Sequence, residues 1–291
     1  ICSNLPEIVA LAHANHMLVL ADEAHGTHFY FHDKLPISAM AAGADMAAVS
    51  MHKTGGSLTQ SSILLTRNSV NPDYVRQIIN LTQTTSASYL LLSSLDIARK
   101  NLSMNGYAMF TKTIDFANYA RAEINRLGGY YAFGTELVNG DTVCGFDSTK
   151  LSIHTRNIGL AGIEVYDLLR DDYGIQIEFG DIGNILAIIS AGDRNMEIER
   201  LISALAEIKR LHEKSPEGLF DHEYINPQIV MGPKDAFYSP KRSMPIRESV
   251  GQICGEFVMS YPPGTTVLAP GERLTSDILK HILCAREKGC F

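Results

Sequence analysis

Two short apolar runs near the start of the chain lead directly into residues that could do chemistry. Met17–Ala21 is followed by Asp22-Glu23-Ala24-His25-Gly26, and Met46–Ser50 is followed by Met51-His52-Lys53-Thr54. Apolar runs without polar alternation are typical of strands buried on both faces of a parallel sheet. Taken singly, each group has a plain structural explanation. Asp22 could cap the next helix, a lone Lys53 would be solvated, and His52 would be a packed histidine.

The spacing of Asp22 and Lys53 changes this interpretation because it corresponds to one helical crossover between neighbouring parallel strands. Both side chains would then stand at the carboxyl edge of the sheet, where α/β folds bind ligands. Pyridoxal phosphate (PLP) chemistry needs an amine and a carboxylate in such a place. The lysine forms the Schiff base, and the carboxylate keeps the pyridine nitrogen protonated so that the ring accepts electrons. Ser50 and His52 flank the lysine and could donate hydrogen bonds to the cofactor phosphate.

The chain resembles the ornithine/lysine/arginine decarboxylase family of PLP-dependent fold-type I enzymes, in its shorter bacterial branch, through ADEAHGTHF followed by SMHKT. It is also similar to that family's TTSPSY segment at Thr84–Tyr89, and to its single PYPPG…PGE motif, which is matched by Ser260–Gly264 and Pro270–Glu272. These four motifs stand in the family's order and cover essentially the whole chain. A lone SxHK motif would not identify a family.

The resemblance implies a role for each matching residue near the cofactor. Asp22 would pair with the pyridine nitrogen, and Lys53 would carry the cofactor. Ser50 and His52 would lie at the phosphate. Ala24 would lie under the ring, where its small methyl group permits a close approach.

Four further residues are implied to act on the substrate or in the partner subunit. His25 stands near the substrate and is counted among the catalytic residues. Thr85 and Ser86 would reach the phosphate of the partner subunit in a homodimer or higher homo-oligomer. Glu272 is a candidate for binding the substrate's cationic end, with fixing of the Pro-rich loop as the alternative.

The resemblance also implies the fold, which is α/β and of PLP fold type I, like aspartate aminotransferase. We expect residues 1–110 to be the C-terminal part of the large domain, 111–214 a linking helix and small α+β domain, and 215–291 a C-terminal domain. The N-terminal half of the large domain is expected to be missing, and this chain alone should then bind PLP poorly. Ala87 departs from the family's usual proline.

Local patterns predict the elements that position these residues. Apolar spacing at three and four residues predicts a helix over 4–16 with Ser3 as its N-cap. Further helices are expected at Ile37–Ala42, Ser88–Leu102, Thr111–Leu127, Gly159–Asp172, Arg194–His212, Ile246–Glu256 and Ser276–Glu287. Further strands are expected at Ser61–Thr66, Lys150–His154, Gln176–Phe179 and Ile185–Ile189. The pair Asn105-Gly106 should break the long helical region, and Gly128-Gly129 should end it.

Composition excludes several other classes of protein. The 291 residues carry a net charge of −7, whereas a sequence-independent nucleic-acid binder needs a basic surface. No apolar run approaches the roughly 20 residues that span a bilayer, and the start does not resemble a signal peptide. The five scattered cysteines favour a reducing cytoplasm over a disulfide framework or zinc site. His13, His16, His28 and His32 lack zinc-site spacing and are better explained by helix-surface and turn positions, so no metal is expected.

These expectations lead to one function and two rivals. The favoured function is PLP-dependent decarboxylation of a small basic amino acid to the corresponding polyamine-pathway amine. Arginine is favoured over lysine or ornithine from the resemblance to the bacterial branch alone. The first rival is another PLP reaction such as transamination, which would need an arginine to hold the substrate carboxylate. The second is an inactive truncated subunit, which would have no reason to keep both Asp22 and Lys53.

Overall fold

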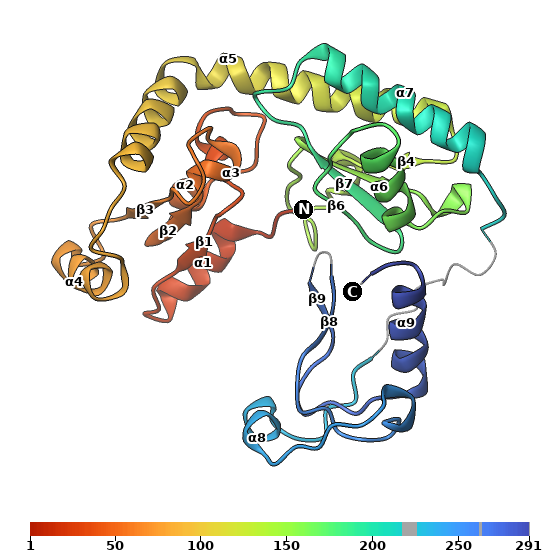
Figure 1. The fold of residues 1–291 in the computed structure, drawn as a ribbon. Coiled ribbons are helices and arrows are strands. Elements are labelled where there is room, and N and C mark those ends of the chain that lie inside the picture. The colour runs from red at the N-terminus through yellow and green to blue at the C-terminus, as the bar shows by residue number, and fades with distance from the viewer. Residues whose placement is uncertain (217–225, 262–263, 291) are drawn as a thin grey trace. The chain divides into compact units, whose positions relative to one another are not determined.

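A computed structural model of the chain describes residues 1–216, 226–261 and 264–290 (Figure 1). The chain divides into two compact units, each considered by itself. The first consists of Ile1–Tyr119, Phe133–Lys150 and Ile189–Asn195, and the second of Ala120–Ala132, Leu151–Ile188 and Met196–Phe291. The expected three-part division at residues 110 and 214 remains a prediction.

The first unit contains a three-stranded sheet that ends at the residues of chemical interest. Its strands β1 (Leu20–Asp22), β2 (Met46–Val49) and β3 (Ile63–Thr66) follow the order β1-β2-β3. β1 and β2 are parallel, with Asp22 opposite Ala48, whereas β2 and β3 are antiparallel. The strands therefore form where the apolar runs predict them.

The expectation that the first two strands are buried on both faces is wrong for the described chain. Leu20 of β1 is 66% exposed, and β1 lies at the edge of this sheet. In β2, Ala47 and Val49 are buried while Ala48 is exposed. Only one face of the central strand is therefore covered, by a cluster that includes Val9.

Short helices surround this sheet. The first, α1 (Leu5–Ala14), confirms the helix expected near the start, although Asn4 rather than Ser3 is its N-cap. The Ser38 side chain caps α2 (Ala39–Ala42) by accepting from the Ala41 N–H. The 3₁₀ turn η1 (Thr27–Tyr30) and the single-turn helix α3 (Met51–Thr54) follow β1 and β2.

A buried carboxylate ties α1, β1 and β2 together. Asp45 accepts hydrogen bonds from the Ser69 hydroxyl at 2.6 Å and from the Val19 N–H at 2.8 Å. Its other contact is the ring of His13, whose Nε2 lies 2.8 Å away. The bonds from Ser69, Val19 and His13 outweigh the effect of burial and lower the pKa of Asp45 to about 2. The start of β2 is therefore held by hydrogen bonds to Asp45 as well as by packing.

The helices α4 (Pro72–Thr82) and α5 (Tyr89–Leu127) complete the helical region (Figure 1). The expected break at Asn105-Gly106 is wrong, because α5 is continuous through both residues. The side chain of Phe31 packs closely against Gly106, where a Cβ would lie 3.1 Å from three atoms of Phe31. The expected end of the helix is confirmed, since Gly128 and Gly129 have φ values of 67° and 77°.

The second unit is built on a four-stranded sheet with the order β4-β5-β7-β6. The described strands are β4 (Tyr131–Ala132), β5 (Lys150–His154), β6 (Phe179–Gly180) and β7 (Asn184–Ile188). The helices that follow in this region are η2 (Thr135–Leu137, assigned to the first unit), η3 (Arg156–Ile158), α6 (Gly162–Asp171) and α7 (Asn195–His212). The predicted strand over Lys150–His154 is confirmed residue for residue.

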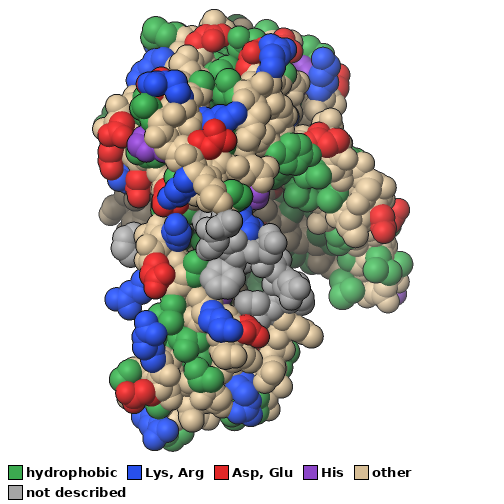
Figure 2. Space-filling view, turned by 90° about the vertical axis from the view of Figure 1, so that its right-hand side faces the viewer, with side chains coloured by type: hydrophobic (Ala, Val, Ile, Leu, Met, Phe, Trp, Pro, Cys, Tyr) green, Lys and Arg blue, Asp and Glu red, His purple; other side chains and the backbone are tan. Residues whose placement is uncertain are grey.

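The C-terminal region contains α8 (Pro233–Tyr238), η4 (Ile246–Glu248), β8 (Val258–Ser260), β9 (Thr265–Leu268) and α9 (Ser276–Glu287). The helix expected over 246–256 is wrong beyond η4, because Gly251 takes a φ of 86° that ends any helix there. The helix over Ser276–Glu287 is confirmed, with Thr275 as its N-cap. Basic and acidic side chains are interspersed on the face drawn in Figure 2.

Candidate active site

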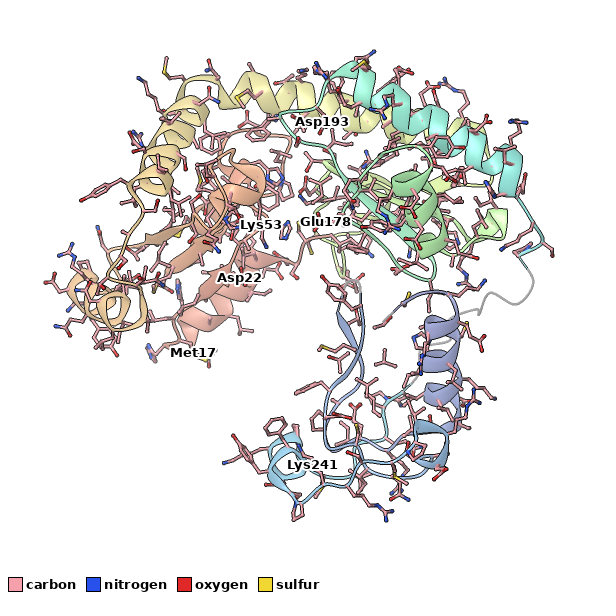
Figure 3. The ribbon with its side chains drawn as sticks, in the orientation of Figure 1. Met17, Asp22, Lys53, Glu178, Asp193 and Lys241 are labelled. Carbon is pink, nitrogen blue, oxygen red and sulfur yellow. The ribbon has the colours of Figure 1, made fainter. Side chains whose placement is uncertain are left out.

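Asp22 and Lys53 stand at the same edge of the first sheet. Asp22 is the last residue of β1, and Lys53 lies in α3, the single turn that follows β2 (Figure 3). Because β1 and β2 are parallel neighbours, their carboxyl ends meet, which is where open α/β sheets bind ligands. Both side chains are exposed. The predicted arrangement of one crossover between the two residues is confirmed.

His25 comes close to the lysine. Its Nε2 lies 3.2 Å from the Nζ of Lys53, although the two residues belong to different turns. An imidazole nitrogen without a proton can accept a hydrogen bond from the lysine ammonium. The structure therefore brings His25 to the amine that would carry a cofactor.

The adjacent carboxylates Asp22 and Glu23 have different partners. Glu23 is folded back, accepting from the Tyr30 hydroxyl at 2.6 Å and from the Ala39 N–H at 2.8 Å. Burial raises the pKa of Glu23, against the opposing effect of these two bonds. Asp22 is exposed and its Oδ1 accepts from the Ala24 N–H at 3.1 Å. Glu23 thus holds the fold, and Asp22 is the carboxylate that a ligand at the sheet edge can reach.

Gly26 permits the folded-back position of Glu23. A Cβ at Gly26 would overlap the side chain of Glu23 and touch the ring of Phe29. The DEAHG sequence therefore combines an exposed acid, an acid folded back onto Tyr30 and Ala39, and the glycine that leaves room for the second acid.

Ser50 and His52 lie in the same turn as Lys53. Ser50 occupies the N-cap position of α3, where its side chain makes no capping hydrogen bond within the described residues. The His52 Nδ1 lies 2.8 Å from the carbonyl oxygen of Ser61. A carbonyl only accepts, so Nδ1 carries the proton, and Nε2 can donate to a phosphate only when the ring is protonated. Contact of either residue with a phosphate stays a prediction.

The remaining predicted site residues have local contacts elsewhere. Thr85 and Ser86 are exposed between α4 and α5, and the Ser86 N–H donates to the Thr84 hydroxyl at 3.2 Å. Glu272 lies in the second unit, where its Oε2 accepts from the Ala269 N–H at 2.9 Å. That bond closes the Pro-Gly loop, so the contact agrees with the alternative role of Glu272, which is to fix this loop. A substrate role for Glu272 remains a prediction.

Sequence reasoning missed a buried hydrogen-bonded pair that joins η1 to a distant aspartate. The Nε2 of His28 lies 2.9 Å from Asp147 Oδ2, and both side chains are almost fully buried. Burial alone would raise the pKa of Asp147, but the bond and charge of His28, with the charge of Lys150, hold it at about 2. The Thr149 hydroxyl donates to the same carboxylate at 2.7 Å. A separation of 119 residues leaves no local signal for this pair.

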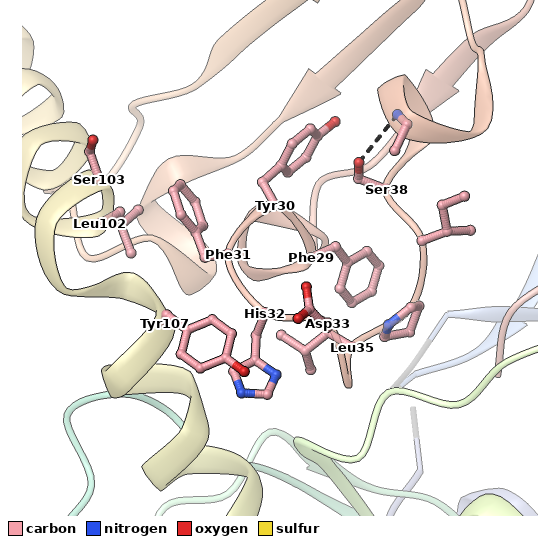
Figure 4. A pocket seen from close by; sticks show the side chains of 13 residues that line it. Phe29, Tyr30, Phe31, His32, Asp33, Leu35, Ser38, Leu102, Ser103 and Tyr107 are labelled. Carbon is pink, nitrogen blue, oxygen red and sulfur yellow. Dashed lines mark hydrogen bonds between the residues drawn. The ribbon is translucent and has the colours of Figure 1, made fainter.

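Of the helix-surface and turn positions expected for these histidines, His28 takes a turn position in η1, but both His28 and His32 are buried rather than at the surface. His32 stacks on Tyr107 with ring centroids 4.4 Å apart, and its Nε2 lies 3.0 Å from the Thr111 hydroxyl. His32 and Tyr107 line a pocket of about 750 Å³, together with Asp33 (Figure 4). Neither Asp22 nor Lys53 lines it, so this pocket is separate from the candidate site.

The described residues contain neither a metal-binding cluster nor a membrane-spanning helix. Among them, no group of three or more His, Cys, Asp or Glu side chains is arranged to hold a metal ion. In the same part of the chain, no helix has the length and apolar character needed to cross a membrane.

Comparison with known proteins agrees with the four sequence motifs. Residues 1–197 match the family described as Orn/Lys/Arg decarboxylase, major domain, and residues 216–289 match its C-terminal domain. The arginine decarboxylase of Halalkalibacterium halodurans is 46% identical over 97% of this chain and 58% of its own length. That of Bacillus subtilis is 43% identical with the same coverage. The chain thus spans less than two thirds of the length of these relatives.

A solved structure shows the same fold. The lysine decarboxylase of Francisella novicida superposes with a TM-score of 0.73 at 20% identity, covering 93% of this chain and 50% of that one. The sequence resemblance is therefore confirmed by family matches over both parts of the chain and by the fold. The chain belongs to the Orn/Lys/Arg decarboxylase family.

Proposed function

We propose that the protein containing this chain decarboxylates a basic amino acid, with arginine as the favoured substrate and PLP as cofactor. The observation that carries the proposal is the placement of Asp22 and Lys53 at one edge of two parallel strands. Relatives named arginine decarboxylase, 42–46% identical over most of this chain, support the choice of arginine. The product would be the corresponding polyamine-pathway amine.

The residues at the sheet edge fit PLP by their chemistry. The exposed Lys53 amine suits an aldehyde, and the exposed Asp22 carboxylate suits a protonated ring nitrogen. Ala24, half-buried beside Asp22, offers only a methyl group to the face of a ring. Ser50 adds a hydroxyl that could donate to a phosphate. When bound, PLP supplies the electron sink for the pair of electrons left behind by departing carbon dioxide.

The protein's own residues would contribute binding, orientation and proton placement. Asp22 would accept the hydrogen bond of the pyridine N–H and so favour its protonated form. His25, 3.2 Å from the Lys53 Nζ, would accept a proton from the ammonium, leaving the neutral amine that can form a covalent bond. His52 would reach the phosphate through Nε2 in its protonated form, because its Nδ1 is bonded to Ser61.

The substrate and the partner subunit are part of the same proposal. Glu272 would pair with the cationic end of the substrate, and Thr85 and Ser86 would reach the phosphate in a homodimer. A large domain of PLP fold type I that lacks its N-terminal half in this chain fits the coverage of 58% of the relatives. The five free cysteines support a reducing, cytoplasmic location, because disulfides persist in oxidising compartments.

The test is product analysis of the intact protein supplied with PLP. Arginine, lysine and ornithine are offered separately, and carbon dioxide, amine and 2-oxo acid are measured, with Lys53→Ala as the control. We expect carbon dioxide and amine in equal amounts, fastest from arginine, and none from the variant. Borohydride reduction should place the pyridoxyl label on Lys53. Formation of 2-oxo acid instead would indicate transamination, and absence of any product from all three would overturn the proposal.

A further inference from the structure

The carbonyl oxygen of Ser50, at the end of β2, accepts two hydrogen bonds. The Lys53 N–H donates to it at 3.1 Å and so closes the turn that carries the lysine. The Thr27 hydroxyl donates to the same oxygen at 3.2 Å. Thr27 begins η1, which directly follows the turn after Asp22. One oxygen atom therefore joins the segment that carries Asp22 to the segment that carries Lys53.

Thr27 also contacts the other end of the lysine turn. Its side chain is buried, with 2% of the residue exposed. A Cβ added at Gly55, the C-cap of α3, would lie 2.9 Å from the Thr27 methyl carbon and 2.8 Å from the Met51 oxygen. The methyl group is thus packed closely on Gly55, while the hydroxyl holds Ser50. The Thr27 side chain therefore contacts both Ser50 and Gly55, the residues on either side of the turn Met51–Thr54.

A helix of four residues depends on such contacts. The turn Met51–Thr54 is far too short to be stable alone, because helix nucleation is unfavourable and longer helices are needed to offset it. On the β3 side, the Ser61 oxygen accepts from the His52 ring at 2.8 Å. On the β1 side, Thr27 makes the corresponding bond to Ser50. The turn that carries Lys53 is therefore held on one side by η1, which follows β1, and on the other by the segment that leads into β3.

We infer that Thr27 is a positioning residue that sets the Lys53 amine relative to the Asp22 carboxylate. The inference rests on the function proposed above, since it is the cofactor that would connect these two groups. Catalytic groups must be held within about 0.5 Å of their productive geometry, and a misplacement of about 1 Å can cost about 100-fold in rate. Thr27 itself acts through Ser50 and Gly55, not on the reacting atoms.

Three variants of the intact protein separate this role from general stability. Thr27→Val keeps the shape of the side chain and removes the donor, whereas Thr27→Ser keeps the donor. The matched control is Thr113→Val in α5 of the same unit. Thr113 is also 2% exposed, and its hydroxyl donates to the Met109 carbonyl at 3.0 Å. Both valine variants therefore delete one buried hydroxyl bonded to a backbone carbonyl.

Five quantities are measured: the dissociation constant for PLP, the rate of borohydride-trapped labelling of Lys53, kcat for arginine, KM for arginine, and the melting temperature. We expect Thr27→Val to weaken PLP binding and to lower kcat and the labelling rate by about tenfold or more, with a smaller change in KM. Thr27→Ser should recover most of this loss. Thr113→Val should lower the melting temperature without changing PLP affinity, labelling or kcat.

Equal effects of Thr27→Val and Thr113→Val on PLP affinity and labelling would overturn the inference, as would a Thr27→Val protein that matches the wild type. If Thr27→Val does not fold, Thr27→Ala removes the same donor without placing a methyl group against the carbonyl, and it is judged by the same comparisons. Failure of the proposed function gives a different result, because the wild-type protein itself would then take no label at Lys53 or release no carbon dioxide from arginine.

Discussion

The Nε2 atom of His25 lies 3.2 Å from the Nζ atom of Lys53, across two turns that follow neighbouring parallel strands. In this contact, His25 can accept a hydrogen bond from the Lys53 amine. The contact between His25 and Lys53 supports a role for His25 that family resemblance alone had implied.

The first prediction concerns this contact. His25→Ala should lower kcat for arginine by about 100-fold, the lower end of what a positioned acid or base contributes. His25→Gln, whose side-chain oxygen can still accept from Lys53, should lose less. Steady-state kinetics with PLP in excess measures both values. A His25→Ala enzyme within twofold of the wild type would show that the contact has no part in turnover.

The second prediction separates the two adjacent carboxylates. Asp22→Asn should reduce turnover by at least about 100-fold with little loss of stability, because it removes an electrostatic partner at the sheet edge. Glu23→Gln should instead lower the free energy of unfolding by about 1–3 kcal/mol, because it weakens buried bonds to Tyr30 and Ala39. Kinetics and urea unfolding of both variants test the assignment. Reversal of the two effects would mean that Glu23 is the functional acid.

The third prediction is a pH dependence of stability from Asp147. Its folded-state pKa of about 2 lies below the ordinary value for an aspartate. Ionised Asp147 therefore stabilises the fold above about pH 4, and this contribution of about 2 kcal/mol is lost as the pH falls towards 2. Urea unfolding at several pH values should show Asp147→Asn less stable than the wild type at pH 6, with the difference shrinking in acid.

The control for that experiment is Asp96→Asn. Asp96 is exposed and pairs with Arg99 at 2.8 Å on the surface of α5, where ion pairs contribute little. We expect it to follow the wild type at every pH. A difference between Asp147→Asn and the wild type that stays constant down to pH 2 would show that the His28 pair does not depend on ionisation of Asp147.

The fourth prediction tests the shared site. A Lys53→Ala subunit and a subunit altered at both Thr85 and Ser86 should each be inactive as homodimers. If Thr85 and Ser86 act in the partner's site, mixed dimers should regain activity at one of their two sites. Subunit exchange is followed independently with differently tagged chains. Demonstrated exchange without any return of activity would restrict the two residues to their own subunit.

The sequence by itself was sufficient for the elements whose signals are local. The apolar runs located β1 and β2, and their separation by one crossover placed Asp22 and Lys53 at one edge. The strand Lys150–His154 and the helix Ser276–Glu287 were predicted with their observed bounds. In each case the signal lies in neighbouring residues, as the spacing of apolar side chains, a capping residue or a residue that ends the element.

Only the tertiary structure decided features that depend on residues far apart in the chain. Asn105-Gly106 resembles a helix break in sequence, yet α5 continues through both residues, and the missing side chain of Gly106 leaves room for Phe31. Glu23 and Asp22 are adjacent acids, and only the partners Tyr30 and Ala39 turn one of them inward. The bond from Thr27 to Ser50 likewise joins two loops. Such contacts are set by how the folded segments pack, and the pattern within either segment does not contain them.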